Sequence, residues 1–252
     1  MSAFSLLENL TPVSGGLSPA AVFRGEYQGQ TVYLKKISPL FSGTTYSVLR
    51  EAKAMEYLGE HLPTPKVLDS GFDADQEWLM MSEIHGKTLD EAAAGDPAVY
   101  VEILAKAIHR LHQLPVANCP LDSRLPLRLE ELRFLLDHGL ADTDRSHWEG
   151  TTEFEDPELL YRYLLENQPD LDPVVTHGDL PANFCVQEDG AILYWDLGRL
   201  GIADRWQDLS LCIRELQERY PDPKWTDEFL RQVGVPLHEK KWQYYLLLDE
   251  LF

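Results

Sequence analysis

Several polar residues in this sequence are suited to handling phosphate and a divalent metal. Asn183 closely follows the loop His177-Gly178-Asp179, so a carboxylate and an amide lie near each other along the chain. Asp179 could accept or orient the proton of a hydroxyl, and Asn183 could bind magnesium through its side-chain oxygen. Taken alone, the same loop also fits a polar turn, because Gly, Asp, Pro and Asn all favour turns.

Asp196 begins the segment Asp196-Leu197-Gly198-Arg199, directly after the apolar run from Ala191 to Trp195. A carboxylate at the end of such a strand can bridge magnesium ions and phosphates, and Gly198 lets the chain turn sharply afterwards. An isolated Asp at a strand end is more often a helix cap. Two metal-competent groups in neighbouring loops, Asn183 and Asp196, are harder to explain as turns. Together they favour a site for phosphoryl transfer.

Lys35 ends the β-type run Val32-Tyr33-Leu34-Lys35, whose alternation puts Tyr33 and Lys35 on the same strand face. A lysine there suits a phosphate contact, and Glu51 on the following helix could hold it through an ion pair. A solvated surface lysine is the alternative. Gly15-Gly16-Leu17-Ser18 could close over phosphates with backbone amides and the Ser18 hydroxyl, although it matches neither GxGxxG nor a Walker A loop.

The elements expected to position these groups form two parts. The first is rich in strands, and the second, from Thr88 onward, is mostly helical. We therefore predict an α+β, bilobal protein-kinase-like fold with a ligand site in the cleft between its lobes. Residues 1–83 would form the nucleotide-binding N-terminal lobe, and 84–252 the catalytic and substrate-binding C-terminal lobe. The expected strands are 20–24, 31–34, 78–82, 173–176 and 191–195, and the expected helices are 47–58, 101–111, 127–140, 158–165, 208–219, 225–233 and 239–252.

Composition narrows the possible partners. The net charge is −20, which disfavours nucleic acid and anionic membranes and suits a cationic ligand, although solubility alone would also explain it. No apolar run approaches the ~20 residues of a membrane helix, and the start carries no basic signal region, so we expect the cytoplasm. The three cysteines are far apart, and we expect them to be reduced and buried.

With these residues assembled, the sequence resembles the aminoglycoside 3′-phosphotransferases, within the wider protein-kinase-like superfamily. The resemblance covers essentially the whole chain, and its most specific part is the closing segment. The segments that carry it include Tyr33-Leu34-Lys35, Gly43-Thr44-Thr45-Tyr46, His177-Gly178-Asp179-Leu180, Asp196-Leu197-Gly198-Arg199, Ala203-Asp204 with Trp206, and Leu247-Leu248-Asp249-Glu250-Leu251-Phe252.

The resemblance implies an enzyme that moves the γ-phosphate of ATP or GTP to a hydroxyl of an aminoglycoside, expected to be the 3′-hydroxyl, with Mg²⁺ as cofactor. Such an enzyme confers antibiotic resistance. Asp179 would be the catalytic carboxylate, and Asn183 and Asp196 the magnesium ligands. The nucleotide contacts would be Lys35, Glu51, Tyr33, Ser18, Ser82 and Ile84. The aminoglycoside contacts would be Asp142, Asp144, Glu149, Arg199, Glu218, Asp249, Glu250 and Phe252.

One departure bears on catalysis. Family members usually have one residue more between the loop Asp and Asn, where this chain has only Leu180, Pro181 and Ala182. Either the loop tightens and Asn183 still reaches the metal, or Asp179 and Asn183 are displaced from the positions that catalysis needs. Two alternatives therefore stay open: a kinase of the same fold acting on another cationic or sugar-like metabolite, and a catalytically impaired nucleotide-binding protein.

Overall fold

The computed structural model describes residues 6–14, 18–73, 75–144, 148, 154 and 156–252. Contacts group the chain into a first unit, Met1–Ala92 with Ala182–Leu200, and a second unit, Ala93–Pro181 with Gly201–Phe252. The segment Ala182–Leu200 groups with the first unit because Lys87 and Val186 exchange backbone hydrogen bonds of 2.9 and 2.8 Å. The predicted division at residues 83 and 84 contains no such return of the chain.

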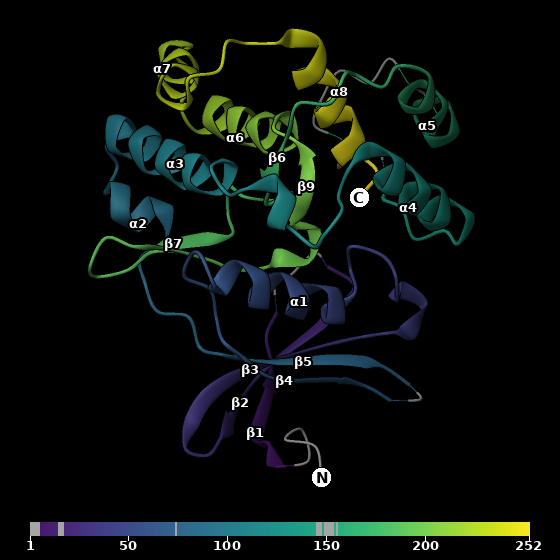
Figure 1. Cartoon of the computed structure of the whole chain (residues 1–252), viewed down its shortest axis with the longest axis vertical. Coiled ribbons are helices and arrows are strands. Elements are labelled where there is room, and N and C mark those ends of the chain that lie inside the picture. Colours follow the sequence, from purple (N-terminus) through teal and green to yellow (C-terminus); the bar gives the residue numbers. More distant parts are fainter. Residues whose placement is uncertain (1–5, 15–17, 74, 145–147, 149–153, 155) are drawn as a thin grey trace. The chain divides into compact units, whose positions relative to one another are not determined.

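The first unit is built on one antiparallel sheet with strand order β1-β2-β3-β5-β4 (Figure 1). Its hairpin between β2 and β3 turns through Gln28 and Gly29, both at positive φ, as a two-residue turn between twisted strands requires. The five strands are β1 (Glu8–Pro12), β2 (Ala21–Tyr27), β3 (Gln30–Ile37), β4 (Val67–Phe72) and β5 (Glu77–Ser82).

Helix α1 (Val48–Gly59) contacts β3, β4 and β5. Its apolar residues recur at helical spacing, and Ser47 caps its start by accepting a hydrogen bond from the Arg50 backbone N–H. Short elements complete the first unit: the 3-10 helices η2 (Pro39–Phe41) and η4 (Leu197–Arg199), helix α2 (Leu89–Ala93), which ends at the first residue of the second unit, and the hairpin of β7 (Phe184–Val186) and β8 (Ile192–Tyr194).

The second unit is a helical assembly around the two-stranded antiparallel sheet of β6 (Pro173–Thr176) and β9 (Gly201–Asp204) (Figure 1). Helix α3 contacts α7, and α6 contacts both α7 and α8. These contacts bury the apolar stripe of each helix, which supplies most of its stability. The helices are α3 (Pro97–His112), η3 (Val116–Asn118), α4 (Leu125–Asp137), α5 (Pro157–Glu166), α6 (Trp206–Arg219), α7 (Lys224–Val233) and α8 (Glu239–Asp249).

Every strand and helix predicted from the sequence is present, with ends that differ by a few residues. The sequence prediction missed β1, β4, β7, β9 and α2. Strand β4 contains Asp69, Ser70 and Gly71, which have low strand propensity, and it forms by pairing along β5. The three cysteines are buried and free, as expected.

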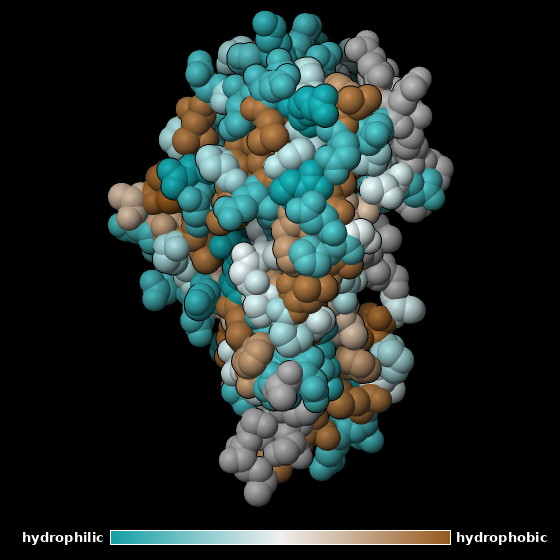
Figure 2. All heavy atoms as spheres, turned by 90° about the vertical axis from the view of Figure 1, so that its right-hand side faces the viewer, coloured by the Kyte–Doolittle hydropathy of each residue, from teal (hydrophilic) through white to brown (hydrophobic). Residues whose placement is uncertain are grey.

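Hydrophilic side chains cover most of the face shown in Figure 2, and hydrophobic side chains appear there in small separate groups. This surface agrees with the 25% of residues that are charged. Among the described residues, no helix is long and apolar enough to cross a membrane.

Candidate functional site

A partly buried lysine binds two carboxylates in the first unit. The Lys35 ammonium donates hydrogen bonds of 2.8 and 2.9 Å to the two carboxylate oxygens of Glu51 and of 2.7 Å to Oδ1 of Asp196. The sequence predicted the ion pair between Lys35 and Glu51. It did not predict the contact of Lys35 with Asp196, the carboxylate at the end of β8. We call these three residues the Lys35 cluster.

Local structure explains how the cluster forms. Alternation along β3 buries Val32 and Leu34 on one face and turns Lys35 to the other, toward α1. Asp196 follows β8 directly and has a left-handed backbone, with φ 55° and ψ 57°. This conformation costs most residues about 1–2 kcal/mol, and aspartate tolerates it better because its short polar side chain can form local hydrogen bonds.

The cluster is strongly coupled electrostatically. Burial alone would lower the pKa of Lys35, but the charges of Glu51 and Asp196 outweigh it and hold that pKa above its ordinary value. Burial raises the pKa of Glu51, and the charge of Lys35 opposes this rise. Lys35 is therefore a permanently charged ammonium at neutral pH, and its side chain is only 14% exposed. Asp196 is the open member of the cluster, with 43% of its side chain exposed.

Asn183 lies beside the Lys35 cluster in the same unit. It immediately precedes β7, and the Trp195 N–H donates a 3.1 Å hydrogen bond to its backbone oxygen, so Asn183 and Asp196 lie at the same end of the β7–β8 hairpin. The amide and carboxylate oxygens of these two residues are hard ligands of the type magnesium prefers, alongside water and substrate phosphates. Among the described residues, no group of three His, Cys, Asp or Glu could hold a metal alone. The donor set therefore fits magnesium bound together with a nucleotide.

The predicted nucleotide contacts lie on β3 and just beyond β5. Tyr33 shares the strand face of Lys35 and pairs with Met81 across the sheet. Ser82 forms two hydrogen bonds with Lys66, both of 3.0 Å. The Ser82 N–H donates to the Lys66 carbonyl, and the Lys66 N–H donates to the Ser82 hydroxyl. Ile84 follows, and neither its N–H nor its carbonyl has a hydrogen-bond partner in the described part of the chain. The predicted contact of Ile84 with the nucleotide base stays a prediction.

The predicted phosphate loop is only partly described. Gly15, Gly16 and Leu17 lie outside the described residues, and Ser18 is exposed, with its hydroxyl accepting a 3.2 Å hydrogen bond from the Ala20 N–H. That contact is a local turn, so the proposed phosphate contact of Ser18 stays a prediction.

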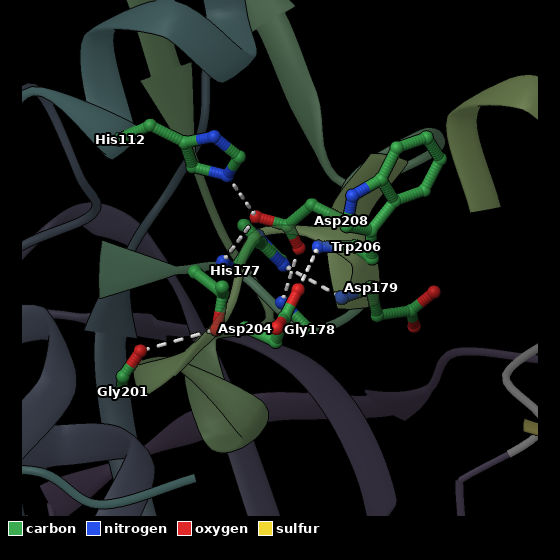
Figure 3. Close-up of polar contacts among 9 residues, drawn as sticks. His112, His177, Gly178, Asp179, Gly201, Asp204, Trp206 and Asp208 are labelled. Atoms are coloured by element: carbon green, nitrogen blue, oxygen red, sulfur yellow. Dashed lines mark hydrogen bonds and ion pairs between the residues drawn. The ribbon is translucent and has the colours of Figure 1, made fainter. Parts of the chain in front are cut away.

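In the second unit, a buried carboxylate organises the loop that carries Asp179 (Figure 3). Asp208 accepts hydrogen bonds from the His177 N–H at 2.9 Å and the Gly178 N–H at 2.7 Å, and it lies 3.1 Å from Nε2 of His112. The Asp179 N–H in turn donates to Nδ1 of His177 at 3.3 Å. The backbone on the N-terminal side of Asp179 is thus fixed from α3 and α6.

Burial would raise the pKa of Asp208, but the hydrogen bond and charge of His112, the charge of His177 and the Gly178 N–H together hold it below its usual value. Asp208 and His177 are completely buried. Asp208 therefore stays a charged acceptor, which strengthens its bonds to the loop. The sequence prediction missed this role of Asp208, and the nearest signal was the Trp206 motif that begins α6.

A second buried carboxylate lies at the start of α6. Asp204 accepts hydrogen bonds from the Trp206 N–H at 2.9 Å, the Asp172 N–H at 2.8 Å and the Lys241 ammonium at 2.6 Å. Figure 3 shows the Asp204 carboxylate bonded to the Trp206 N–H. These bonds fix the junction of β9 and α6, and this explains the Ala203-Asp204 and Trp206 motif physically.

Two segments predicted to bind the substrate come together in the second unit. The Asp142 N–H donates a 3.3 Å hydrogen bond to the Leu251 carbonyl, which joins the acidic connection to the chain terminus. Asp144 is held by a 3.0 Å bond from its N–H to Oδ1 of Asp142. Glu149 lies outside the described residues. Glu250 is buried, whereas Asp249 forms an ion pair of 3.0 Å with Arg214.

The terminal Phe252 ring lies against a buried arginine. The Arg128 guanidinium is centred 3.7 Å from the ring and pairs with Glu131 at 2.8 Å. Arg128 also lines a small pocket together with Gly178 and Asp249, so the loop that carries Asp179 and the end of α8 border one depression. The other predicted contacts lie elsewhere: Glu218 on α6, and Arg199 in η4 of the first unit, near the Tyr46 ring.

Comparison with known proteins places the chain in a family. The family model for the phosphotransferase enzyme family matches residues 9–244. A curated aminoglycoside 3'-phosphotransferase of Campylobacter jejuni is 44% identical over 246 residues, covering 98% of each chain. The chain belongs to the aminoglycoside 3'-phosphotransferase family. A further member, from Enterococcus faecalis, is 37% identical to it over 94% of this chain and 91% of its own length.

Solved structures of aminoglycoside phosphotransferases share the fold of this family member. A type VIII aminoglycoside-3'-phosphotransferase matches with a TM-score of 0.81 and 29% identity, covering 97% of this chain and 93% of its own. A phosphotransferase from Streptomyces rimosus, solved with ADP and streptomycin, matches with a TM-score of 0.77 and 26% identity over 96% and 91% of the two chains. These matches confirm the predicted α+β, protein-kinase-like fold.

Proposed function

We propose that this chain is an aminoglycoside O-phosphotransferase that transfers the γ-phosphate of ATP or GTP to the 3′-hydroxyl of an aminoglycoside and so confers resistance. The observation that carries the proposal is the Lys35 cluster, a permanently charged ammonium on a sheet face beside an exposed carboxylate. Phosphoryl transfer needs phosphates and metal held in place more than it needs covalent chemistry. The identity to aminoglycoside 3'-phosphotransferases supplies the acceptor class.

Nucleotide binding is assigned to the first unit. The Lys35 ammonium contacts the phosphates, and Glu51 keeps it charged and oriented toward them. Tyr33 on the same strand face stacks on the base, and the unpartnered backbone groups of Ile84 bind its edge. The related Streptomyces rimosus structure holds ADP, which supports a nucleotide as the donor.

Asn183 and Asp196 would hold Mg²⁺ through their side-chain oxygens. When bound, magnesium neutralises charge that develops on the phosphates. The Asp196 side chain is 43% exposed, so its carboxylate is accessible to a cation while Oδ1 accepts from Lys35.

Asp179 is assigned as the group that orients the acceptor hydroxyl and takes its proton. The hydroxyl oxygen forms a bond to the γ-phosphorus, the bond from that phosphorus to the bridging oxygen breaks, and the nucleoside diphosphate leaves. Asp208 and His177 hold the loop so that Asp179 meets the hydroxyl in a fixed orientation.

The acceptor is recognised by carboxylates of the second unit. The carboxylates of Asp142, Asp144, Asp249 and Glu250 lie in segments that meet where the Asp142 N–H bonds the Leu251 carbonyl. An acidic surface also attracts a polycationic substrate over a distance. Streptomycin, another aminoglycoside, occupies the related structure from Streptomyces rimosus. We place the reaction in the cytoplasm, where the nucleoside triphosphate donor is available.

A coupled assay of nucleoside diphosphate release tests this function with a panel of aminoglycosides. The wild-type chain should turn over only when nucleotide, Mg²⁺ and an aminoglycoside are all present. Asp179→Ala should reduce kcat at least about 100-fold, and Asp170→Asn, an exposed site in the same unit, should not. The proposal would be contradicted by a chain that binds nucleotide and Mg²⁺ but shows no turnover with any aminoglycoside of the panel.

A further inference from the structure

Arg50 precedes Glu51 on α1 and reaches the turn that follows Asp196. Its Nε donates a 2.9 Å hydrogen bond to the Gly198 carbonyl, and its Nη2 donates a 3.0 Å bond to the Leu200 carbonyl. Those two carbonyls bracket the end of η4, which begins one residue after Asp196. Neighbouring residues of one helix turn thus hold two different parts of the site, Glu51 the lysine and Arg50 the turn.

The turn also lies tightly against the loop before α1. A Cβ atom at Gly198 would overlap the Thr45 carbonyl oxygen, so the backbone of this turn approaches that loop as closely as it can. The Arg199 guanidinium lies 5.9 Å from the centre of the Tyr46 ring, on the same loop. The position of η4 is therefore set from α1 and from the loop that precedes α1.

We propose that Arg50 is a positioning residue for Asp196, and this inference rests on the proposed function of the site. Asp196 has a left-handed backbone, so the direction of its carboxylate depends on the turn that follows it keeping this form. The guanidinium presents its N–H groups in a rigid fork, so it fixes the spacing of the two carbonyls it binds. Arg50 stabilises this form of the turn and keeps the Asp196 carboxylate where it contacts both Lys35 and a cation.

The geometry separates this role from that of Glu51. Glu51 binds the ammonium of Lys35, and its loss disturbs the phosphate contact first. Arg50 binds the backbone oxygens of Gly198 and Leu200 in the turn, and its loss displaces Asp196. The two neighbours should therefore differ in what they change: nucleotide binding for Glu51, and the magnesium requirement for Arg50.

Arg50→Met, Arg50→Lys and Lys53→Met test the role, since Lys53 is an exposed residue of the same helix. One readout is the Mg²⁺ concentration that gives half of the thermal stabilisation by ADP, and the other is steady-state turnover. For Arg50→Met we expect this Mg²⁺ concentration to rise about 10-fold or more and kcat to fall about 100-fold, with KM for the aminoglycoside unchanged. Arg50→Lys, which can still donate to one carbonyl, should recover part of both losses, and Lys53→Met should match wild type.

Two results would overturn the role. One is an Arg50→Met protein with the wild-type Mg²⁺ dependence and kcat. The other is a variant that loses thermal stability without any change in its Mg²⁺ dependence, which indicates a purely structural residue. Because the ADP and Mg²⁺ readout needs no acceptor, it tests Arg50 even if wild type turns over no aminoglycoside, so the two proposals can fail separately.

Discussion

Replacing Asp208 by asparagine removes the buried charge that holds the Asp179 loop. Oδ2 accepts from His177 and faces His112, and Oδ1 accepts from Gly178, so an amide can keep one side of this arrangement only. Its NH₂ group must then face an N–H donor. One lost charge-assisted bond and one unsatisfied buried donor cost about 3 kcal/mol together.

For a chain of this size, that loss corresponds to a fall in Tm of about 6–12 °C. The loop should also shift, and a displacement of about 1 Å at Asp179 lowers kcat about 100-fold. Thermal unfolding and coupled turnover of Asp208→Asn measure both effects. Asp172→Asn is the matched control, because the Asp172 side chain is 48% exposed in its pair with Arg205 and should contribute only about 0–1 kcal/mol.

The stability that Asp208 contributes should decrease at low pH. The pKa of Asp208 is lowered in the folded chain, so its contribution is present above the unfolded pKa of about 3.9 and is lost as pH falls through the folded value. The difference in Tm between wild type and Asp208→Asn should therefore be constant near neutral pH and shrink below about pH 4. A variant with wild-type Tm and kcat at pH 7 would refute the assigned role of Asp208.

Three further substitutions test other parts of the account. Lys35→Met should lower kcat about 100- to 1,000-fold and weaken nucleotide binding, because it leaves two carboxylates facing each other without a cation; turnover and nucleotide titration measure this. Gly198→Ala should reduce the free energy of unfolding by about 1–3 kcal/mol in a denaturant melt, since its methyl group meets the Thr45 carbonyl; an unchanged midpoint would contradict that close approach. Deleting Phe252 removes the ring beside Arg128 and should raise KM for the aminoglycoside about tenfold while KM for the nucleotide stays constant, in steady-state assays that vary each substrate in turn.

Local patterns account for what the sequence predicted well. The ion pair of Lys35 with Glu51 follows from strand alternation and the apolar stripe of the next helix, because both fix which way a side chain points. Asp196 could be placed at a strand end for the same reason, but its contact with Lys35 joins residues far apart in sequence and needed the structure.

Long-range contacts account for what the sequence did not reveal. Asp208 resembles any acid in the first turn of a helix, where a carboxylate often stabilises the helix dipole. Its bonds to the Asp179 loop exist only because α3, α6 and that loop meet in the fold. Arg128 and the Phe252 ring lie against each other for the same kind of reason, and neither residue has a local pattern that predicts the contact.

The position of the transferred phosphate is the most direct test of the central claim. Two matched aminoglycosides, one with and one without the 3′-hydroxyl, would be incubated with the wild-type chain, nucleotide and Mg²⁺, and the products analysed by mass spectrometry and phosphorus NMR. The account predicts one phosphate, on the 3′ oxygen, for the first compound and no product for the second. Equal phosphorylation of both compounds, or of neither while nucleotide still binds, would contradict it.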